Sequence, residues 1–313
     1  MNNIVKLSEA LTELQAMPDE SVDLIYTDPP FGTGNVQQIQ RKVAGQLFPK
    51  MQYSDKFANY MNFLVPHLEE LHRVLKPTGT LYLHLDWRWS HYAKVACDEI
   101  FGYDNFLNEI VWSYNFGGRG KDRWPMKHDT ILVYVKKIGK HTFNWDNIDR
   151  IPYAAPELQY VGRTKEEAEK RIAEGQVPTD VWSMSIVGTS SKERSGYPTQ
   201  KPLKLVERII KASSNPGDHV LDPFVGSGTT AVASYKLGRQ FTVFDKNEQA
   251  IGTTAKRLNE LGALGSTQVI IPDSQDHDEQ NPFPRNTHPY HPVPVFWLLC
   301  LTYYLPAPHY LGA

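Results

Sequence analysis

The residues best suited to chemistry form a short motif at the end of an apolar, β-prone run. The motif consists of Asp28, Pro29, Pro30 and Phe31. Consecutive prolines lack backbone donors and hold the chain extended, which leaves the carbonyls of Asp28 and Pro29 able to accept hydrogen bonds. A carboxylate, free carbonyls and an aromatic ring at the carboxyl end of a strand can bind a flat group that carries an NH2. The motif therefore predicts a site for such a group, although a Pro-Pro pair alone also marks an ordinary turn.

A second motif, residues 222–230, joins a predicted strand to a predicted helix. Its Gly226 and Gly228 allow a ligand to approach the backbone and leave the N-terminus of the helix accessible. Asp245 ends the next predicted strand, where a carboxylate can accept hydrogen bonds from ribose hydroxyls. The motif also fits the dinucleotide pattern GxGxxA, so by itself it indicates a nucleotide-like cofactor without identifying it.

Both motifs need a framework of buried strands, and the apolar patterning supplies one. Strands are predicted over residues 22–26, 79–85, 110–114, 130–135, 219–222 and 241–245. Apolar residues at helical spacing predict helices within residues 4–17 and 53–75. From residue 202 onward helices and strands alternate, which implies parallel strands joined by helical crossovers.

Composition narrows the class of protein. The 313 residues suffice for one large or two modest domains, with the apolar and charged content of a soluble globular protein. Of the net charge of −2, residues 265–313 carry −3 (four acidic residues, one basic), so residues 1–264 carry +1. Cys97 and Cys300 offer neither metal-ligand spacing nor a disulfide framework, which suits a reducing cytosol. The N-terminus lacks a signal-peptide pattern, and the longest apolar run, residues 295–305, is too short to span a bilayer. We therefore expect a cytoplasmic protein without a metal site or a membrane segment.

Together, the two motifs resemble those of the beta class of DNA amino-methyltransferases, in which the target-amine motif precedes the cofactor motif. The segments that carry the resemblance, in that family's order, are PDESVDLIYTDPPF, LKPTGTLYLHLD, KHDTILVYVK and Tyr197–Asn247. They fall within about residues 4–262. The resemblance implies a doubly wound α/β domain over residues 1–264, with a mostly parallel, seven-stranded methyltransferase sheet in circularly permuted motif order.

Two segments depart from the regular pattern of that domain. The resemblance implies a small target-recognition insert at about residues 115–196, where periodicity is lost except for a charged helix near residues 165–174. Residues 265–313 are rich in proline and histidine and offer no amphipathic element. We predict that they form a weakly ordered tail.

The resemblance also implies roles for individual residues. Asp28, Pro29 and Pro30 would bind the exocyclic amine of a flipped base, and Phe31 would stack on that base. The residues implied as contacts of S-adenosylmethionine are Glu9, Thr199, Gln200, Lys201, Asp222, Phe224, Gly226, Gly228, Thr229 and Asp245. Among these, residues 199–201 would close over the methionine end. At two positions the chain departs from the family's common residues: Glu9 replaces Asp, and Phe31 replaces Tyr, which keeps the stacking ring and loses the hydroxyl.

The chemistry of a base amine agrees with this resemblance. The amine is a poor nucleophile because its lone pair is delocalised into the ring, and hydrogen bonds to Asp28 and to the Pro29 carbonyl would favour a tetrahedral nitrogen. Positioning beside the sulfonium methyl group would then supply much of the rate. The base must leave the helix, at a cost of a few kcal/mol. We expect site-specific methylation of adenine N6 in double-stranded DNA, because Asp at the first motif position is commoner for adenine in this family.

Three alternatives stay open at this point. Cytosine N4 is the nearest alternative target, a nicotinamide-dependent oxidoreductase would also explain the glycine pattern, and a catalytically inactive DNA-binding relative would share the fold. The sequence does not reveal the recognition sequence, whether the chain forms a homodimer, or whether it is paired with a restriction endonuclease.

Basic residues predict where DNA would contact the protein. The predicted phosphate contacts are Arg119, Lys121, Arg123, Lys127, Lys192 and Arg194. Single basic residues are also common on solvated surfaces, so the prediction rests on the group. Trp87, Trp89 and Trp112 are predicted as core residues rather than base-stacking surfaces, and His84 as a packed residue of its strand.

Overall fold

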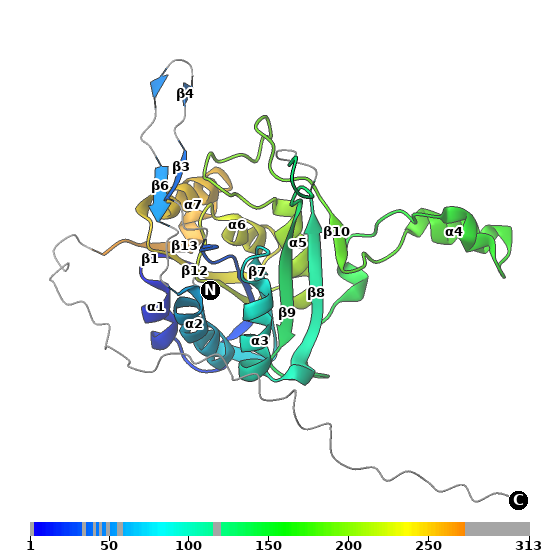
Figure 1. The fold of residues 1–313 in the computed structure, drawn as a ribbon, viewed down its shortest axis with the longest axis horizontal. Coiled ribbons are helices and arrows are strands. Elements are labelled where there is room, and N and C mark those ends of the chain that lie inside the picture. The colour runs from blue at the N-terminus through cyan, green and yellow to red at the C-terminus, as the bar shows by residue number, and fades with distance from the viewer. Residues whose placement is uncertain are drawn as a thin grey trace, which may run out of the picture. The chain divides into compact units, whose positions relative to one another are not determined.

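Nine strands form one mixed sheet in the part of the chain that the structure describes (Figure 1). This computed structural model describes residues 3–32, 59–114 and 120–272, together with the backbone of short strands within residues 36–54. The sheet strands are β1 (Asn3–Leu7), β2 (Val22–Thr27), β7 (Leu75–Leu85), β8 (Phe106–Ser113), β9 (His128–Val135), β10 (Val181–Ser183), β11 (His219–Asp222), β12 (Gln240–Asp245) and β13 (Thr267–Ile270). Their spatial order is β10-β8-β9-β7-β2-β11-β12-β1-β13.

The sheet is parallel except around β9, which runs antiparallel to both β7 and β8. Between β2 and α2 in the sequence, four short strands form two separate antiparallel pairs, β3 with β6 and β4 with β5. Their bounds are β3 (Val36–Ile39), β4 (Lys42–Val43), β5 (Gln46–Leu47) and β6 (Met51–Ser54). A mostly parallel sheet must be covered on both faces, because crossover helices lie over each of them.

Helices cover the two faces of the sheet. They are α1 (Ala10–Ala16), α2 (Tyr60–Val74), α3 (Ser90–Phe101), α5 (Leu203–Ser213), α6 (Thr229–Lys236) and α7 (Glu248–Glu260), and α4 (Lys165–Glu174) lies in the predicted insert. Buried residues of α1 to α3 form one apolar cluster and those of α5 to α7 form the other. The predicted doubly wound α/β fold is therefore confirmed.

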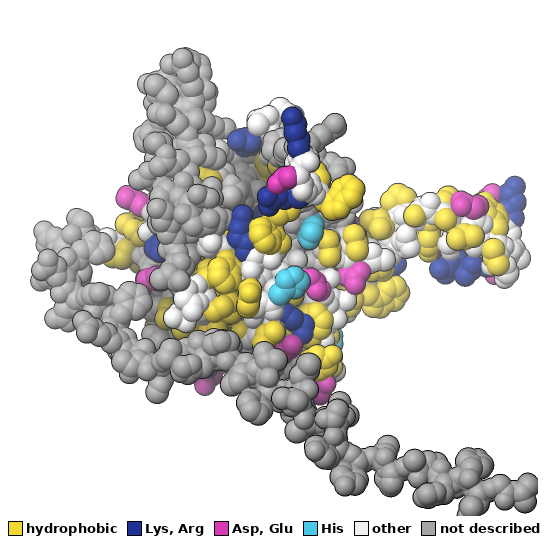
Figure 2. Space-filling view, viewed as in Figure 1, with side chains coloured by type: hydrophobic (Ala, Val, Ile, Leu, Met, Phe, Trp, Pro, Cys, Tyr) yellow, Lys and Arg dark blue, Asp and Glu magenta, His cyan; other side chains and the backbone are white. Residues whose placement is uncertain are grey.

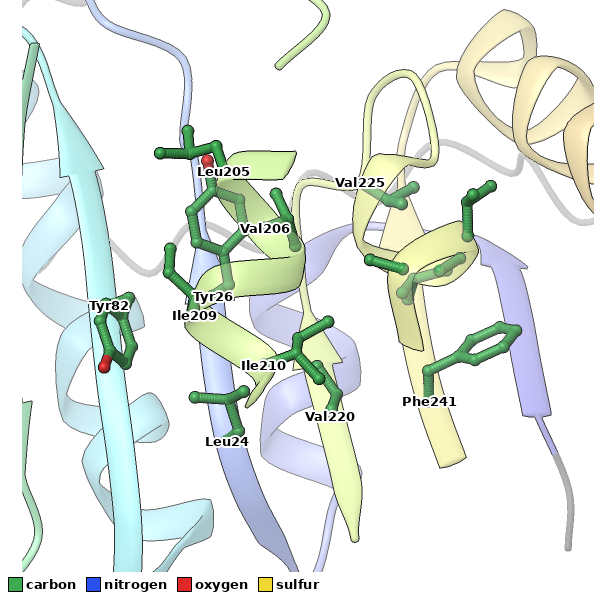
Figure 3. Packing of buried hydrophobic residues seen from close by; sticks show 14 of the residues in the cluster. Leu24, Tyr26, Tyr82, Leu205, Val206, Ile209, Ile210, Val220, Val225 and Phe241 are labelled. Carbon is green, nitrogen blue, oxygen red and sulfur yellow. The ribbon is translucent and has the colours of Figure 1, made fainter. Parts of the chain in front are cut away.

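Strand β2 contributes to both clusters because successive side chains of a strand point to opposite faces. Its Leu24 and Tyr26 pack in the cluster with α5 (Figure 3), whereas Ile25 packs in the cluster with α2. Val22 also packs in the cluster with α2, and the register of β2 against β7 shifts between Val22 and Leu24. All four side chains are at most 2% exposed. Burial on both faces fixes the register of β2, and with it the place where the chain emerges at Asp28.

The structure corrects the prediction of a seven-stranded sheet, since short edge strands raise the number to nine. The helix predicted within residues 4–17 is strand β1 followed by helix α1, because Leu7 belongs to the strand and only Leu11 and Leu14 to the helix. At the other edge, β13 pairs with β1, so the predicted tail begins later than residue 265. Residues 273–313 of that tail lie outside the described residues.

The predicted target-recognition insert is not one continuous addition to the sheet domain. Its range, 115–196, contains β9, which is a central strand of the sheet. The added structure therefore lies on either side of β9. The longer part carries α4, whose N-terminus is closed by reciprocal hydrogen bonds between Thr164 and Glu167.

Candidate active site

The two sequence motifs meet at the carboxyl ends of three neighbouring strands. β2 pairs with β11 and β11 pairs with β12, all parallel, so Asp28, Asp222 and Asp245 emerge at the same edge of the sheet. This edge is where open α/β sheets bind ligands. One cavity lies there, and its walls include the predicted site residues Glu9, Asp28, Pro29, Pro30, Phe31, Thr199, Lys201, Asp222, Phe224, Gly226, Thr229 and Asp245.

Two predicted cofactor residues lie behind the cavity wall instead of lining it. The side-chain oxygen of Gln200 accepts hydrogen bonds from the amide and hydroxyl of Ser195 (both 2.8 Å), and its nitrogen donates to the Glu193 carbonyl (2.7 Å). Gly228 caps α6 with φ +81°, and a Cβ there would lie 2.6 Å from the Thr254 hydroxyl. Gln200 therefore braces the loop before α5, and Gly228 allows α6 to pack against α7.

Carboxylates hold the glycine loop in shape. Asp245 accepts hydrogen bonds from the amides of Gly226 and Asn247, both at 2.9 Å. Asp222 accepts from the Phe224 amide (3.0 Å) and the Thr230 hydroxyl (2.5 Å). Burial raises the pKa of Asp222 to about 7 and the pKa of Asp245 to about 6, against these hydrogen bonds. Asp222, which is 2% exposed, and Asp245 both line the cavity in addition to holding the loop.

An ion pair ties the amine motif to the segment before α5. The Lys201 ammonium donates to Oδ2 of Asp28 and lies 4.9 Å from the centre of the Phe31 ring. The other carboxylate oxygen, Oδ1 of Asp28, is buried and has no hydrogen-bond partner among the described residues. A buried acceptor without a donor is costly, so this oxygen is suited to a donor supplied by a ligand.

A second cavity, of about 480 Å³, adjoins the first. The two share Phe31, Thr199 and Lys201, and the second is also lined by Asp129 and Arg194. Thr199 has φ +56°, a left-handed conformation that β-branched residues rarely adopt. The shared wall is thus built from the aromatic ring of one motif and a strained turn before α5.

A buried polar chain that the sequence analysis missed links the two cavities. The Tyr26 hydroxyl lies 2.9 Å from Nδ1 of His84, whose Nε2 lies 3.1 Å from Asp129, which also accepts from the Tyr114 hydroxyl (3.0 Å). Burial opposes the ionisation of Asp129, but the hydrogen bond from His84 and the charge of Lys201 outweigh it and lower the pKa of Asp129. His84 is fully buried, as predicted, and a polar residue inside an apolar strand was the available signal.

The tryptophans divide between core and surface. Trp112 is 2% exposed and Trp89 packs against the cluster around α2, as predicted, but Trp87 is 46% exposed and lines the second cavity. The interpretation of Trp87 as a core residue is wrong, because it stands just beyond the end of β7, where the chain leaves the sheet.

The predicted phosphate contacts are mostly exposed. Lys121, Arg123 and Lys192 are exposed, Lys127 is half-buried, and Arg119 lies outside the described residues. Arg123 pairs with the neighbouring Asp122 at 2.9 Å, whereas Arg194 lines the second cavity. Figure 2 shows Lys and Arg in separate groups among acidic and apolar side chains on the face in view. Of the predicted contacts that the structure describes, Arg194 is the one that lines a cavity at the candidate site.

The described residues contain neither a cluster of metal-ligating side chains nor a membrane-spanning helix. In that part of the chain, no group of three or more His, Cys, Asp or Glu side chains could hold a metal ion. None of the helices in that part of the chain is both long and apolar enough to cross a membrane.

Comparisons with known proteins agree on one family. The family described as DNA methylase matches residues 22–256. The type II methyltransferase M.HpaI of Haemophilus parainfluenzae is 36% identical over 253 residues, which are 80% of this chain and 73% of the relative. The DNA adenine methyltransferase YhdJ of Escherichia coli K12 is 33% identical over 252 residues, 80% of this chain and 81% of the relative.

Solved structures show the same fold. The complex of M1.HpyAVI with SAM has a TM-score of 0.54 at 24% identity and covers 83% of this chain and all of the other chain. The cytosine-N4-specific PvuII DNA methyltransferase has a TM-score of 0.58 at 15% identity and covers 86% of this chain and 95% of its own. The family match leaves no place for the oxidoreductase interpretation of the glycine pattern.

Proposed function

This chain belongs to the DNA methylase family, and on that premise we propose that it transfers a methyl group from S-adenosylmethionine to the N6 amine of adenine in double-stranded DNA. The observation that carries the proposal is the single cavity in which Asp28 of the amine motif meets Gly226 and Asp245 of the cofactor motif. The description of the relative YhdJ as a DNA adenine methyltransferase supports adenine as the target.

The lining of the cavity suits the proposed cofactor chemically. Gly226 has φ +50°, and a Cβ there would lie 3.3 Å from the Tyr197 ring, so glycine suits this position in both conformation and packing. Asp245 retains acceptor capacity for ribose hydroxyls beyond its two amide bonds. The Phe224 ring, 5.9 Å from Phe63 and 5.3 Å from His67, belongs to an aromatic wall suited to a purine. When bound, S-adenosylmethionine supplies an electrophilic methyl group.

The amine motif would prepare the nucleophile. Oδ1 of Asp28 accepts one hydrogen of the target amine, while Lys201 holds Oδ2 and compensates the buried negative charge. The Pro29 carbonyl accepts the second hydrogen, which directs the nitrogen lone pair away from the motif. Phe31 stacks on the base and fixes its plane. These groups act by positioning and electrostatics, which can supply a large part of a rate enhancement.

The second cavity would receive the base after it leaves the helix. It adjoins Phe31 and is large enough to hold a flat ring, and Arg194 on its wall can contact a phosphate of the flipped nucleotide. The exposed Lys121, Arg123 and Lys192 would add contacts to the DNA backbone. Such contacts orient the duplex without specifying its sequence.

Nucleoside mass spectrometry on DNA incubated with the protein and S-adenosylmethionine tests the proposal. We expect N6-methyladenine, and sequencing of the modified sites then gives the recognition sequence. N4-methylcytosine would move the target to the other base amine, and no methylated base would overturn the proposed activity.

A matched pair of variants ties the activity to the site. Asp28→Ala should lower the rate of methyl transfer by about a hundredfold or more, since one electrostatic contact in an active site is worth about 10²–10³. Asp146→Ala removes an exposed carboxylate and should retain wild-type activity. Both variants should bind S-adenosylmethionine.

A further inference from the structure

Lys201 occupies the boundary between the two cavities. It is only 8% exposed, yet it lines both cavities. Its backbone is held by the cofactor loop, because the Thr229 hydroxyl donates to the Lys201 carbonyl at 3.1 Å. The same hydroxyl accepts from Nη1 of Arg257 at 3.1 Å. A lysine anchored in this way presents its ammonium at a defined place.

The ammonium has more donors than its present contacts use. Of its three N–H groups, one is directed to Oδ2 of Asp28, and no other acceptor contacts the nitrogen among the described residues. The adjacent Oδ1 of Asp28 is the acceptor without a donor. Side by side, the site therefore offers one acceptor oxygen without a donor and one ammonium with two unused N–H groups.

This acceptor–donor pair is complementary to one type of base edge. Adenine presents the N6 amine next to the ring nitrogen N1, and cytosine presents the N4 amine next to N3, so in both a donor adjoins an acceptor. At the corresponding Watson–Crick positions, guanine and thymine present the reverse, a carbonyl oxygen next to a ring N–H. Enzymes that flip a base read it through such hydrogen bonds.

We propose that Lys201 donates a hydrogen bond to the ring nitrogen beside the target amine, so that Asp28 and Lys201 together recognise the edge shared by adenine and cytosine. The inference rests on the proposed methyl transfer and gives Lys201 a role toward the base, where the sequence resemblance implied one toward the cofactor. Lys201 is then a positioning and specificity residue, because guanine and thymine offer no ring-nitrogen acceptor for its hydrogen bond at this position.

A purely structural role for Lys201 makes a different prediction. If the lysine only neutralises Asp28, the ring nitrogen of the base is irrelevant to it. The two roles are separated by removing that nitrogen from the substrate, because this change leaves the ion pair untouched.

The experiment uses duplexes that carry adenine, 1-deazaadenine or 7-deazaadenine at the methylated position. Single-turnover rates are measured with wild type, Lys201→Met and Lys201→Arg. For wild type, loss of N1 should lower the rate by about ten- to a hundredfold, the range of a hydrogen bond to a charged group, whereas loss of N7 should change it little. In Lys201→Met the reaction with adenine should already be slow, and loss of N1 should cause no further decrease.

Lys201→Arg keeps a charged donor and should keep some sensitivity to N1, and it serves as the second variant if the methionine variant does not fold. Equal sensitivity to loss of N1 in wild type and Lys201→Met, or wild-type insensitivity, would overturn the inference while the proposed activity stands. Absence of methylation on unmodified DNA would overturn the activity itself. If the product is N4-methylcytosine, 3-deazacytosine is the matching probe.

Discussion

The Asp245 carboxylate lies 2.9 Å from the amide nitrogen of Gly226, so the end of β12 is hydrogen-bonded to the loop that follows β11. The same carboxylate borders the cavity proposed for the cofactor. Its ionisation therefore affects both the shape of the loop and the binding of the ribose.

This relationship predicts that cofactor affinity depends on pH. Burial raises the pKa of Asp245 to about 6, and the protonated form loses charge and acceptor capacity. Below pH 6 the dissociation constant of S-adenosylmethionine should rise, by about tenfold at one unit below the pKa. Isothermal titration calorimetry between pH 5 and pH 8 measures this change. Asp245→Asn should bind weakly without this dependence, and Asp146→Asn should behave as wild type; a flat wild-type profile would contradict the assignment.

Asp222 predicts a pH dependence of stability. Its pKa is raised from 3.8 to about 7 in the folded state by burial. The neutral form therefore contributes stability below pH 4, and this contribution is lost as pH rises to about 7, by roughly 4 kcal/mol at most. Asp222→Asn has no carboxyl group to ionise and should not lose this stability. The free energy of unfolding of the variant relative to wild type should therefore increase as pH rises from 4 to 7. Urea unfolding at pH 4, 5.5 and 7.5 measures the difference, and parallel profiles would refute it.

Substitutions at two glycines distinguish the cost of backbone strain from the cost of a steric clash. Gly228 and Gly238 both have positive φ, +81° and +72°, but only at Gly228 would a Cβ meet another atom, the Thr254 hydroxyl at 2.6 Å. Gly238→Ala should cost about 1–2 kcal/mol for the left-handed conformation alone. Gly228→Ala should cost about 1–3 kcal/mol more, because α6 must move away from α7. Chemical denaturation gives both values, and equal costs would mean that Thr254 yields freely.

Strand β13 predicts where the folded unit can be shortened. It pairs with β1 through residues 267–270. A chain ending at Pro272 should retain its melting temperature and methyl transfer. A chain ending at Leu264 should lose a few kcal/mol of stability with the hydrogen bonds of β13, at about 1 kcal/mol each. Thermal unfolding of the two truncated proteins compares them directly, and equal melting temperatures would show that β13 is dispensable.

The sequence predicted those parts of the fold that long apolar patterns determine. The strands that lead to Asp28, Asp222 and Asp245 are bounded by turn residues, and the structure brings these three residues together at one cavity. The edge strands β10 and β13 were missed because they are only three and four residues long, too short for a periodic pattern. In β1 the position of Leu7 also suits a helix, so spacing alone could not decide.

The contacts within the site were harder to predict because they join distant parts of the chain. Lys201 and Asp28 are 173 positions apart, and nothing near Lys201 indicates that its ammonium turns toward Asp28 rather than the cofactor. The contact of His84 with Asp129 likewise exists only because β7 and β9 are neighbours in the sheet. Gln200 lies in sequence between two residues of the first cavity, yet it lines the second cavity and its side chain donates to the Glu193 carbonyl.

Thr199, on the wall shared by the two cavities, has a consequence for engineering. A β-branched residue with φ +56° costs about 1–3 kcal/mol of folding free energy, which glycine or asparagine would largely avoid. A chain selected for thermal tolerance alone would hold one of those residues at position 199. Because Thr199 lines both cavities, we expect Thr199→Asn to raise the free energy of unfolding and to lower the rate of methyl transfer.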